Sequence, residues 1–150
     1  GISVDGVEEH KKWKGDIETF AGAKAGFPII ADNDLTVAKA FDMLPADAYL
    51  PDGRTPNDSA TVRAVFIIGP DKQLKLSMTY PMTVGRNFAE VLRALDGLQT
   101  STGKGVATPA NWNVGDDVII PATLSDDDAK AKFGDFNKIL PYLRTTKAPS

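Results

Sequence analysis

The sequence predicts an α/β fold, and three features of its 150 residues support that class. Short apolar segments with strand character alternate with segments whose apolar residues recur every three or four positions, as in helices. A hairpin pattern follows over residues 61–80, where two strand-like segments flank a Gly-Pro-Asp-Lys turn. The hydrophobic fraction of 42% suffices for one core, and the absence of cysteine excludes disulfides and thiolate metal sites within these residues.

The N-terminal part of the chain is predicted to run from strand to helix. Residues 2–4 alternate like a short strand, and apolar residues then recur with helical spacing from Val7 to Ala21. Asp5 is the expected N-cap of this helix, because Glu8 three residues later completes a pattern close to a capping box. The glycines after residue 21 are expected to end the helix.

A second strand, a second helix and a loop are predicted next. Residues 27–30 have the apolar character of a short buried strand, and the Asp-Asn-Asp run at residues 32–34 predicts the start of a helix. Residues 44–58 hold three prolines and one glycine among polar neighbours, a composition that is typical of an exposed loop.

A β-hairpin followed by a helix is predicted after this loop. The apolar run 61–68 and the alternating segment 74–80 flank a turn with Pro70 at its second position. Asn87 begins an Asn-x-x-Glu pattern, which predicts the start of the next helix. We expect that helix to end at Asp96-Gly97 and the Gly/Thr-rich run that follows.

The composition changes to Gly, Thr, Pro and Asn from residue 103. We therefore predict a main domain at residues 1–102 and a C-terminal extension at residues 103–150. The extension holds an apolar segment at 118–120 and a short helix capped by Ser125, with three aspartates in its first turn. Because its apolar positions are few, it is expected to pack on the main domain or on a partner subunit rather than form a core alone.

The predicted order of elements is β-α-β-α-β-β-α plus the extension. Strands that alternate with helices imply a parallel sheet, and the hairpin adds an antiparallel edge, so a thioredoxin-like α/β sandwich is the simplest architecture. The formal net charge of −3 and the pI of about 5.1 provide no electrostatic footprint for nucleic acid. No apolar run approaches the roughly 18 residues that span a bilayer.

Two arginines are the candidates for chemistry. Arg63 lies in the apolar run 61–68, so its guanidinium must be paired or face a cleft at the strand's end, unless the residue lies on the surface where the strand begins. Arg86 directly precedes the predicted helix start at Asn87, where backbone amides and a cation favour an anion. A solvated arginine beside a cap is the alternative for Arg86.

Other residues point to structure rather than chemistry. His10 is the only histidine, and its place beside the apolar face of the first helix predicts a core or boundary residue. One histidine without cysteine argues against zinc, and the Asp126–Asp128 run lacks the spacing of a calcium loop. Trp13 and Trp112 are expected to be packing anchors. We expect no metal and no cofactor.

A set of segments runs through the chain at residues 3–13, 27–32, 62–72, 80–81, 85–88, 106–112 and 115–118. In their order and spacing these segments resemble peroxiredoxins, over essentially all 150 residues. The last two are similar to the C-terminal extension of the one-cysteine subfamily.

The resemblance implies a thioredoxin-fold peroxidase that reduces hydrogen peroxide and organic hydroperoxides through a cysteine thiolate, which an external thiol reductant regenerates. Arg63 takes the family position of the arginine that lowers the thiol pKa and stabilises the leaving oxygen, and Arg86 that of a second arginine near the site. Ala107-Thr108-Pro109 stands where two-cysteine relatives carry a resolving cysteine, which fits the one-cysteine type.

The family's nucleophile lies in a Pro-x-x-x-Thr-x-x-Cys motif that this sequence lacks. We therefore expect the C-terminal part of a one-cysteine peroxiredoxin, incomplete at its N-terminus and inactive as a peroxidase by itself. The intact protein is expected to be a cytoplasmic homodimer. Two alternatives are a non-catalytic thioredoxin-like interaction or dimerisation module, and a lipid-hydrolysing side activity in which Asp71 would take part.

Overall fold

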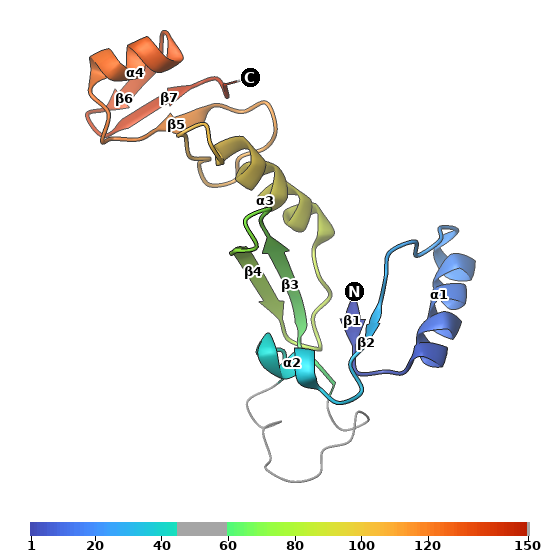
Figure 1. Cartoon of the computed structure of the whole chain (residues 1–150). Helices are drawn as coiled ribbons and strands as arrows, with labels where there is room; N and C mark the ends of the chain where they lie inside the picture. The colour runs from blue at the N-terminus through green and yellow to red at the C-terminus, as the bar shows by residue number, and fades with distance from the viewer. Residues whose placement is uncertain (45–59, 150) are drawn as a thin grey trace. The chain divides into compact units, whose positions relative to one another are not determined.

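The computed structural model describes residues 1–44 and 60–149, which form seven strands and four helices (Figure 1). Apart from Leu44 itself, the predicted loop at 44–58 lies outside the described residues. The chain divides into two compact units, and each has its own buried core. The first unit comprises Gly1–Phe66 and Ser77–Arg86, and the second comprises Ile67–Leu76 and Asn87–Ser150.

The first unit begins with a parallel β-α-β arrangement. β1 (Ile2–Ser3) pairs with β2 (Ile30–Ala31), and α1 (Val7–Ala21) connects the two strands. The helix ends at Gly22, which has a φ of 67° and donates its N–H to the carbonyl of Glu18. This left-handed conformation favours glycine, so the predicted helix end is confirmed.

Two expectations for α1 are wrong. Gly6 is the N-cap in place of Asp5, whose carboxylate instead accepts a hydrogen bond from Ser3 Oγ at 2.9 Å. Trp13 is 48% exposed and is therefore not a packing anchor. His10 is the buried side chain of this helix. The periodicity thus predicts the helix correctly, whereas the burial of each side chain depends on what packs against it.

The first unit buries its core beside α2 (Thr36–Ala40). This helix begins where Asp32 accepts hydrogen bonds from the N–H groups of Val37 and Ala38, at 2.9 and 2.7 Å. The acidic run therefore accepts hydrogen bonds from the first turn of the helix, but the N-cap position itself is occupied by Leu35 and not by a residue of this run. The buried core residues of this unit are Val4, Leu35, Ala38, Met43 and Leu44.

The predicted β-hairpin is confirmed. β3 (Arg63–Ile68) and β4 (Leu74–Tyr80) form a two-stranded sheet and contribute residues to both units. In the turn between them the N–H of Lys72 donates to the carbonyl of Gly69 at 2.9 Å. β3 begins two residues later than the apolar run suggested.

The second unit contains α3 (Phe88–Ser101), which begins at its predicted cap. The Asn87 side chain accepts a hydrogen bond from the N–H of Glu90 at 3.3 Å. The helix continues through Asp96-Gly97, where an end was expected, and ends at Ser101 within the run of residues 100–105 that was also expected to end it. Gly97 is buried, and a Cβ atom there would stand 3.4 Å from Oγ1 of Thr108, so the segment after the helix lies against α3 at this point.

A three-stranded antiparallel sheet, two of whose strands the sequence does not predict, follows α3. Its strand order is β5 (Val118–Ile120), β7 (Leu143–Thr146) and β6 (Asn137–Leu140), and α4 (Asp126–Phe133) lies between β5 and β6 in the chain. Ser125 caps α4 as predicted, accepting a hydrogen bond from the N–H of Asp128 at 3.0 Å.

The C-terminal residues contain a small buried cluster and also contact α3 of the predicted main domain, as expected, because Arg93 Nη1 donates to the carbonyl of Trp112 at 3.3 Å. Trp112 is 2% exposed and clusters with Val106 and Val118, and Phe133 packs against them. Trp112 is therefore a packing anchor, as predicted. A single large indole supplies much of the buried apolar area that the sparse composition lacks. The domain division after residue 102 stays a prediction.

Candidate functional site

Arg63, the first residue of β3, has an exposed side chain. Its Nη1 atom donates to the backbone carbonyl of Val84 at 3.4 Å. A partner for this guanidinium was expected because burying an unpaired charge is costly. Since the side chain is exposed, that cost does not arise. Of the predicted arrangements, Arg63 is found on the surface where the strand begins, and its side chain extends to the 81–86 segment.

Arg86 lies at the end of this same segment and is also exposed. A turn shapes the segment, because the N–H of Val84 donates to the carbonyl of Pro81 at 2.9 Å. Arg86 follows Val84 by two residues and directly precedes Asn87, the cap of α3. The contact of Arg63 with Val84 therefore brings one candidate guanidinium to the backbone segment that carries the other.

A hydrogen-bonded group at the start of the chain involves the one histidine. His10 is buried, and its Nε2 atom lies 2.7 Å from Oγ of Ser3, which in turn donates to Asp5 at 2.9 Å. The Nδ1 atom of His10 has no hydrogen-bond partner among the described residues. The prediction of a core histidine is confirmed.

The part of the chain that the structure describes holds no group of three His, Cys, Asp or Glu side chains that could bind a metal ion. Two of the aspartates at the start of α4 have other partners: Asp128 accepts a hydrogen bond from the cap residue Ser125, and Asp126 forms ion pairs with Lys138 and Arg144.

Comparison with known proteins assigns the family. Residues 1–77, just over half of the chain, match the AhpC/TSA family, and residues 97–135 match the C-terminal domain of 1-Cys peroxiredoxin. Peroxiredoxin-6 of Gallus gallus is 46% identical over 99% of this chain and 69% of its own length. The chain belongs to the 1-Cys peroxiredoxin family.

Other relatives of this peroxiredoxin share a similar degree of identity. The mitochondrial peroxiredoxin PRX1 of Saccharomyces cerevisiae is 52% identical over 99% of this chain, which spans 56% of that protein. 1-Cys peroxiredoxin B of Oryza sativa is 47% identical over 89% of the chain, which spans 59% of it. The chain thus covers a little more than half to about two thirds of its relatives' length.

Solved structures confirm the expected thioredoxin-like peroxiredoxin fold. The yeast mitochondrial 1-Cys peroxiredoxin matches with a TM-score of 0.83 and 49% identity, over 98% of this chain and 68% of that one. Peroxiredoxin 6 of Arenicola marina matches with a TM-score of 0.86 and 43% identity, over 99% of this chain and 69% of that one.

The expectation that this protein is cytoplasmic is wrong. PRX1, the relative at 52% identity, is a mitochondrial protein, so membership of this family does not imply a cytoplasmic location. Within the described residues, no helix is long and apolar enough to cross a membrane.

Asp71 of this peroxiredoxin is held by an ion pair in the β3–β4 turn. Its Oδ2 atom lies 2.5 Å from Nζ of Lys75, and Oδ1 accepts a hydrogen bond from the N–H of Gln73 at 3.2 Å. The hydrogen bond from Lys75 is the main reason that the pKa of Asp71 lies below its ordinary value. The carboxylate therefore stays ionised and stabilises the turn.

Sequence reasoning did not find the Val84 carbonyl as a partner for Arg63. A backbone oxygen carries no signature in the sequence, and the two residues are 21 positions apart. The Pro81 turn could have suggested that this segment folds back, but not which side chain it meets.

Proposed function

We propose that this chain is part of a thiol peroxidase that reduces hydrogen peroxide and organic hydroperoxides. The observation that carries the proposal is the 52% identity to yeast PRX1, a peroxiredoxin, over 99% of the chain. Because the 150 residues contain no cysteine, the attacking thiol in this proposal belongs to the full-length protein.

The proposed reaction makes two demands on charge. A cysteine thiolate attacks one peroxide oxygen, and the O–O bond breaks as the S–O bond forms. The sulfur becomes a sulfenic acid, and the other oxygen leaves as hydroxide or alkoxide and takes a proton to form water or an alcohol. The thiolate must therefore exist at neutral pH, and the leaving oxygen must be stabilised as it gains negative charge.

Arg63 and Arg86 are proposed to meet these demands. A guanidinium is permanently cationic and has several N–H donors, so it can lower a thiol pKa and hydrogen-bond the peroxide oxygens. Two observations support this assignment. Both side chains are exposed, and the Nη1 contact with the Val84 carbonyl holds Arg63 at the segment that bears Arg86.

The cycle requires a thiol reductant from outside the chain. Two equivalents of thiol convert the sulfenic acid to the starting thiol, a disulfide and water. For the yeast mitochondrial relative, the solved structure concerns thiol resolution through the glutathione and thioredoxin systems. We propose that this protein uses a reductant of the same chemical class.

We further propose that residues 103–150 form a C-terminal extension of the main domain and that the intact protein is a homodimer. Exposed apolar side chains on the β6–β7 hairpin, those of Ile139, Leu140 and Tyr142, support a subunit contact. Light scattering on the full-length protein tests the homodimer. A molar mass of one subunit across the micromolar range would reject it.

The proposed roles are tested by the rate of peroxide reduction by the full-length protein. Removing one preorganised donor costs on the order of 100-fold in rate, so Arg63→Met and Arg86→Met should each lower the second-order rate constant for hydrogen peroxide by about that factor. The thiol pKa, followed by the absorbance of the thiolate, should rise in both variants.

Lys12→Met is a matched control, because it also removes one exposed cation and the Lys12 side chain makes no hydrogen bond or ion pair in the described part of the chain. Its rate constant and thiol pKa should equal those of the unaltered protein. Unchanged rates in both arginine variants would reject the assigned roles. A full-length protein that consumes no peroxide with any thiol reductant would reject the peroxidase itself.

A further inference from the structure

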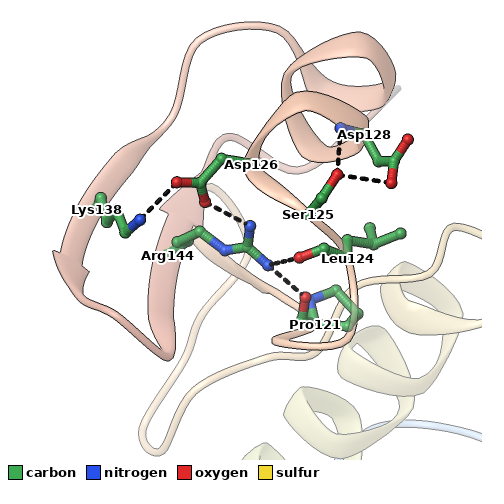
Figure 2. Close-up of polar contacts among 7 residues, drawn as sticks. All are labelled: Pro121, Leu124, Ser125, Asp126, Asp128, Lys138 and Arg144. Atoms are coloured by element: carbon green, nitrogen blue, oxygen red, sulfur yellow. Dashed lines mark hydrogen bonds and ion pairs between the residues drawn. The ribbon is translucent and has the colours of Figure 1, made fainter.

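Arg144 is a buried cation that the proposed peroxidase chemistry does not use. It lies in β7, is 2% exposed, and donates to the carbonyls of Pro121 and Leu124 at 2.7 and 2.8 Å (Figure 2). Its Nη1 atom lies 2.9 Å from Oδ1 of Asp126, and its guanidinium stands over the ring of Phe136. Its Nε atom has no hydrogen-bond partner among the described residues.

A second cation lies directly across the sheet from Arg144. Lys138 of β6 is the register partner of Arg144 in the antiparallel pairing of β6 with β7. Like charges in this arrangement repel, and the repulsion is strongest where one of them is buried. The pairing of the two strands at this point therefore needs a negative charge close to both cations.

Asp126, the first residue of α4, supplies that charge. Its Oδ1 atom pairs with Arg144, and its Oδ2 atom lies 2.5 Å from Nζ of Lys138 (Figure 2). We call this Lys138–Asp126–Arg144 arrangement the Asp126 bridge. It joins the first turn of α4 to both strands of the β6–β7 hairpin.

The other acidic side chains in α4 and directly after its end do not share this role. Asp128 accepts a hydrogen bond from Ser125 Oγ at 2.7 Å and belongs to the helix cap. Asp135 pairs with Lys130 at 3.7 Å. Asp127 makes no contact within the described residues. The loop between β5 and α4 meets Arg144 with carbonyl oxygens only.

We propose that the Asp126 bridge is an electrostatic latch: the Asp126 charge holds the β6–β7 hairpin closed on α4, and its neutralisation releases the hairpin. Without this charge, the buried Arg144 and the facing Lys138 are two neighbouring cations that no carboxylate compensates. Removing one partner of a buried pair costs far more than the pair itself contributes, because the remaining charge stays out of water.

The ionisation of Asp126 fixes the pH range of the latch. The pKa of its carboxyl lies below the ordinary value of 3.8, first because Lys138 donates a hydrogen bond to it and also because Arg144 does. A carboxyl with a depressed pKa stabilises the folded state above its unfolded pKa, and that stabilisation is lost as the pH falls through the folded value. The latch is therefore closed at neutral pH and opens only in acid.

Hydrogen exchange of the full-length protein at pH 7, followed by mass spectrometry, tests the latch. Asp126→Asn should raise the exchange rates of the β6 and β7 amides about tenfold, a moderate value for a pair in which Asp126 is half exposed. Asp127→Asn is the matched control, because it removes the same charge from the same helical turn. Its rates should stay within about twofold of the unaltered protein.

A second variant keeps the test decisive if Asp126→Asn unfolds the C-terminal sheet. In Asp126→Asn with Arg144→Met the buried cation is gone, so the exchange rates should return toward those of the unaltered protein. Equal exchange in Asp126→Asn and Asp127→Asn would overturn the proposal. So would a double variant that exchanges faster than Asp126→Asn alone. Neither result depends on peroxidase activity.

Discussion

The Nε2 atom of His10 in α1 lies 2.7 Å from the Oγ atom of Ser3 in β1. This contact joins the first strand to the first helix and gives the buried imidazole a polar partner. Since Nδ1 has none among the described residues, Ser3 is the side chain on which the hydrogen bonding of His10 depends.

Replacing Ser3 should therefore destabilise the full-length protein. Ser3→Ala leaves a buried polar group unsatisfied, so we expect a loss of about 1–3 kcal/mol in the free energy of unfolding, measured by urea denaturation. Ser77→Ala in β4 is the control, because Ser77 is exposed and its side chain makes no hydrogen bond to the described residues. Equal losses in the two variants would contradict the role of the Ser3 contact.

Substitutions at Gly97 test how closely α3 packs against the segment that contains Thr108. Gly97→Ala should change stability by about 0 to 1 kcal/mol in the favourable direction, because alanine is the better helix former. The added Cβ would meet Thr108 Oγ1 at an acceptable 3.4 Å. Gly97→Val should instead lose about 1–3 kcal/mol, because its methyl groups have no room.

The control for this pair is Gly15→Ala in α1, where an added Cβ meets nothing within 4 Å. Thermal unfolding should show a gain of roughly 0.5–1 kcal/mol there. If Gly97→Val were as stable as Gly97→Ala, α3 and the segment containing Thr108 would not be closely packed.

Trp112 is expected to dominate the core of the C-terminal residues. It is 2% exposed, and its Nε1 atom donates to the carbonyl of Asp116 at 3.2 Å. Trp112→Ala should cost about 3–5 kcal/mol, and Trp112→Phe less, because it keeps a ring but loses the hydrogen bond. Denaturant unfolding measures both variants.

Trp13→Ala provides the comparison, since this indole is 48% exposed. We expect a loss below about 1 kcal/mol. A loss for Trp13→Ala that matched that of Trp112→Ala would mean that exposure does not rank the two tryptophans correctly.

At the N-cap of α3, the direction of the expected change in stability depends on which residue replaces Asn87. Asn87→Ala should lose about 1 kcal/mol, because the N–H of Glu90 loses its acceptor. Asn87→Asp keeps an acceptor and adds negative charge at the positive end of the helix, so it should match or exceed the original stability by up to about 1 kcal/mol in low salt. A loss for Asn87→Asp as large as that for Asn87→Ala would show that the side-chain acceptor does not stabilise this helix.

The elements that the sequence predicted correctly depend on partners a few residues apart. The turn from Gly69 to Lys72, the Asn87 cap and the Ser125 cap each close a hydrogen bond over three residues. Such contacts form wherever the local backbone permits, so the residue types reveal them. Asp5 shows the limit of this reasoning. It has the residue type of a cap, but it accepts from Ser3 and leaves that position to Gly6.

Other predictions failed because they concern contacts between distant residues. Helical spacing placed Trp13 and His10 on one face of α1, yet only His10 is buried. The sequence also offered no reason to expect β6 and β7, which are four residues long each and in which Lys138 and Arg144 face one another across the sheet.

The candidate site follows the same division. Arg63 and Arg86 were chosen from the sequence and from the family resemblance, and their roles rest on the rate measurements above. The contact of Arg63 with the Val84 carbonyl appears only in the structure, because a backbone acceptor has no residue type.

By itself, the sequence of this peroxiredoxin determined three things: the order of elements as far as the hairpin, the positions of several caps and turns, and the family. The order of motifs and the short-range hydrogen bonds depend on residues that are neighbours in the sequence. The sequence also indicated that His10 and Trp112 are buried, but only the tertiary structure decided that Trp13 is exposed and that Arg144 is buried. Arg144 is the clearest case: it is a cation in a short polar strand, and it is buried because Asp126, 18 residues earlier, brings a carboxylate to it.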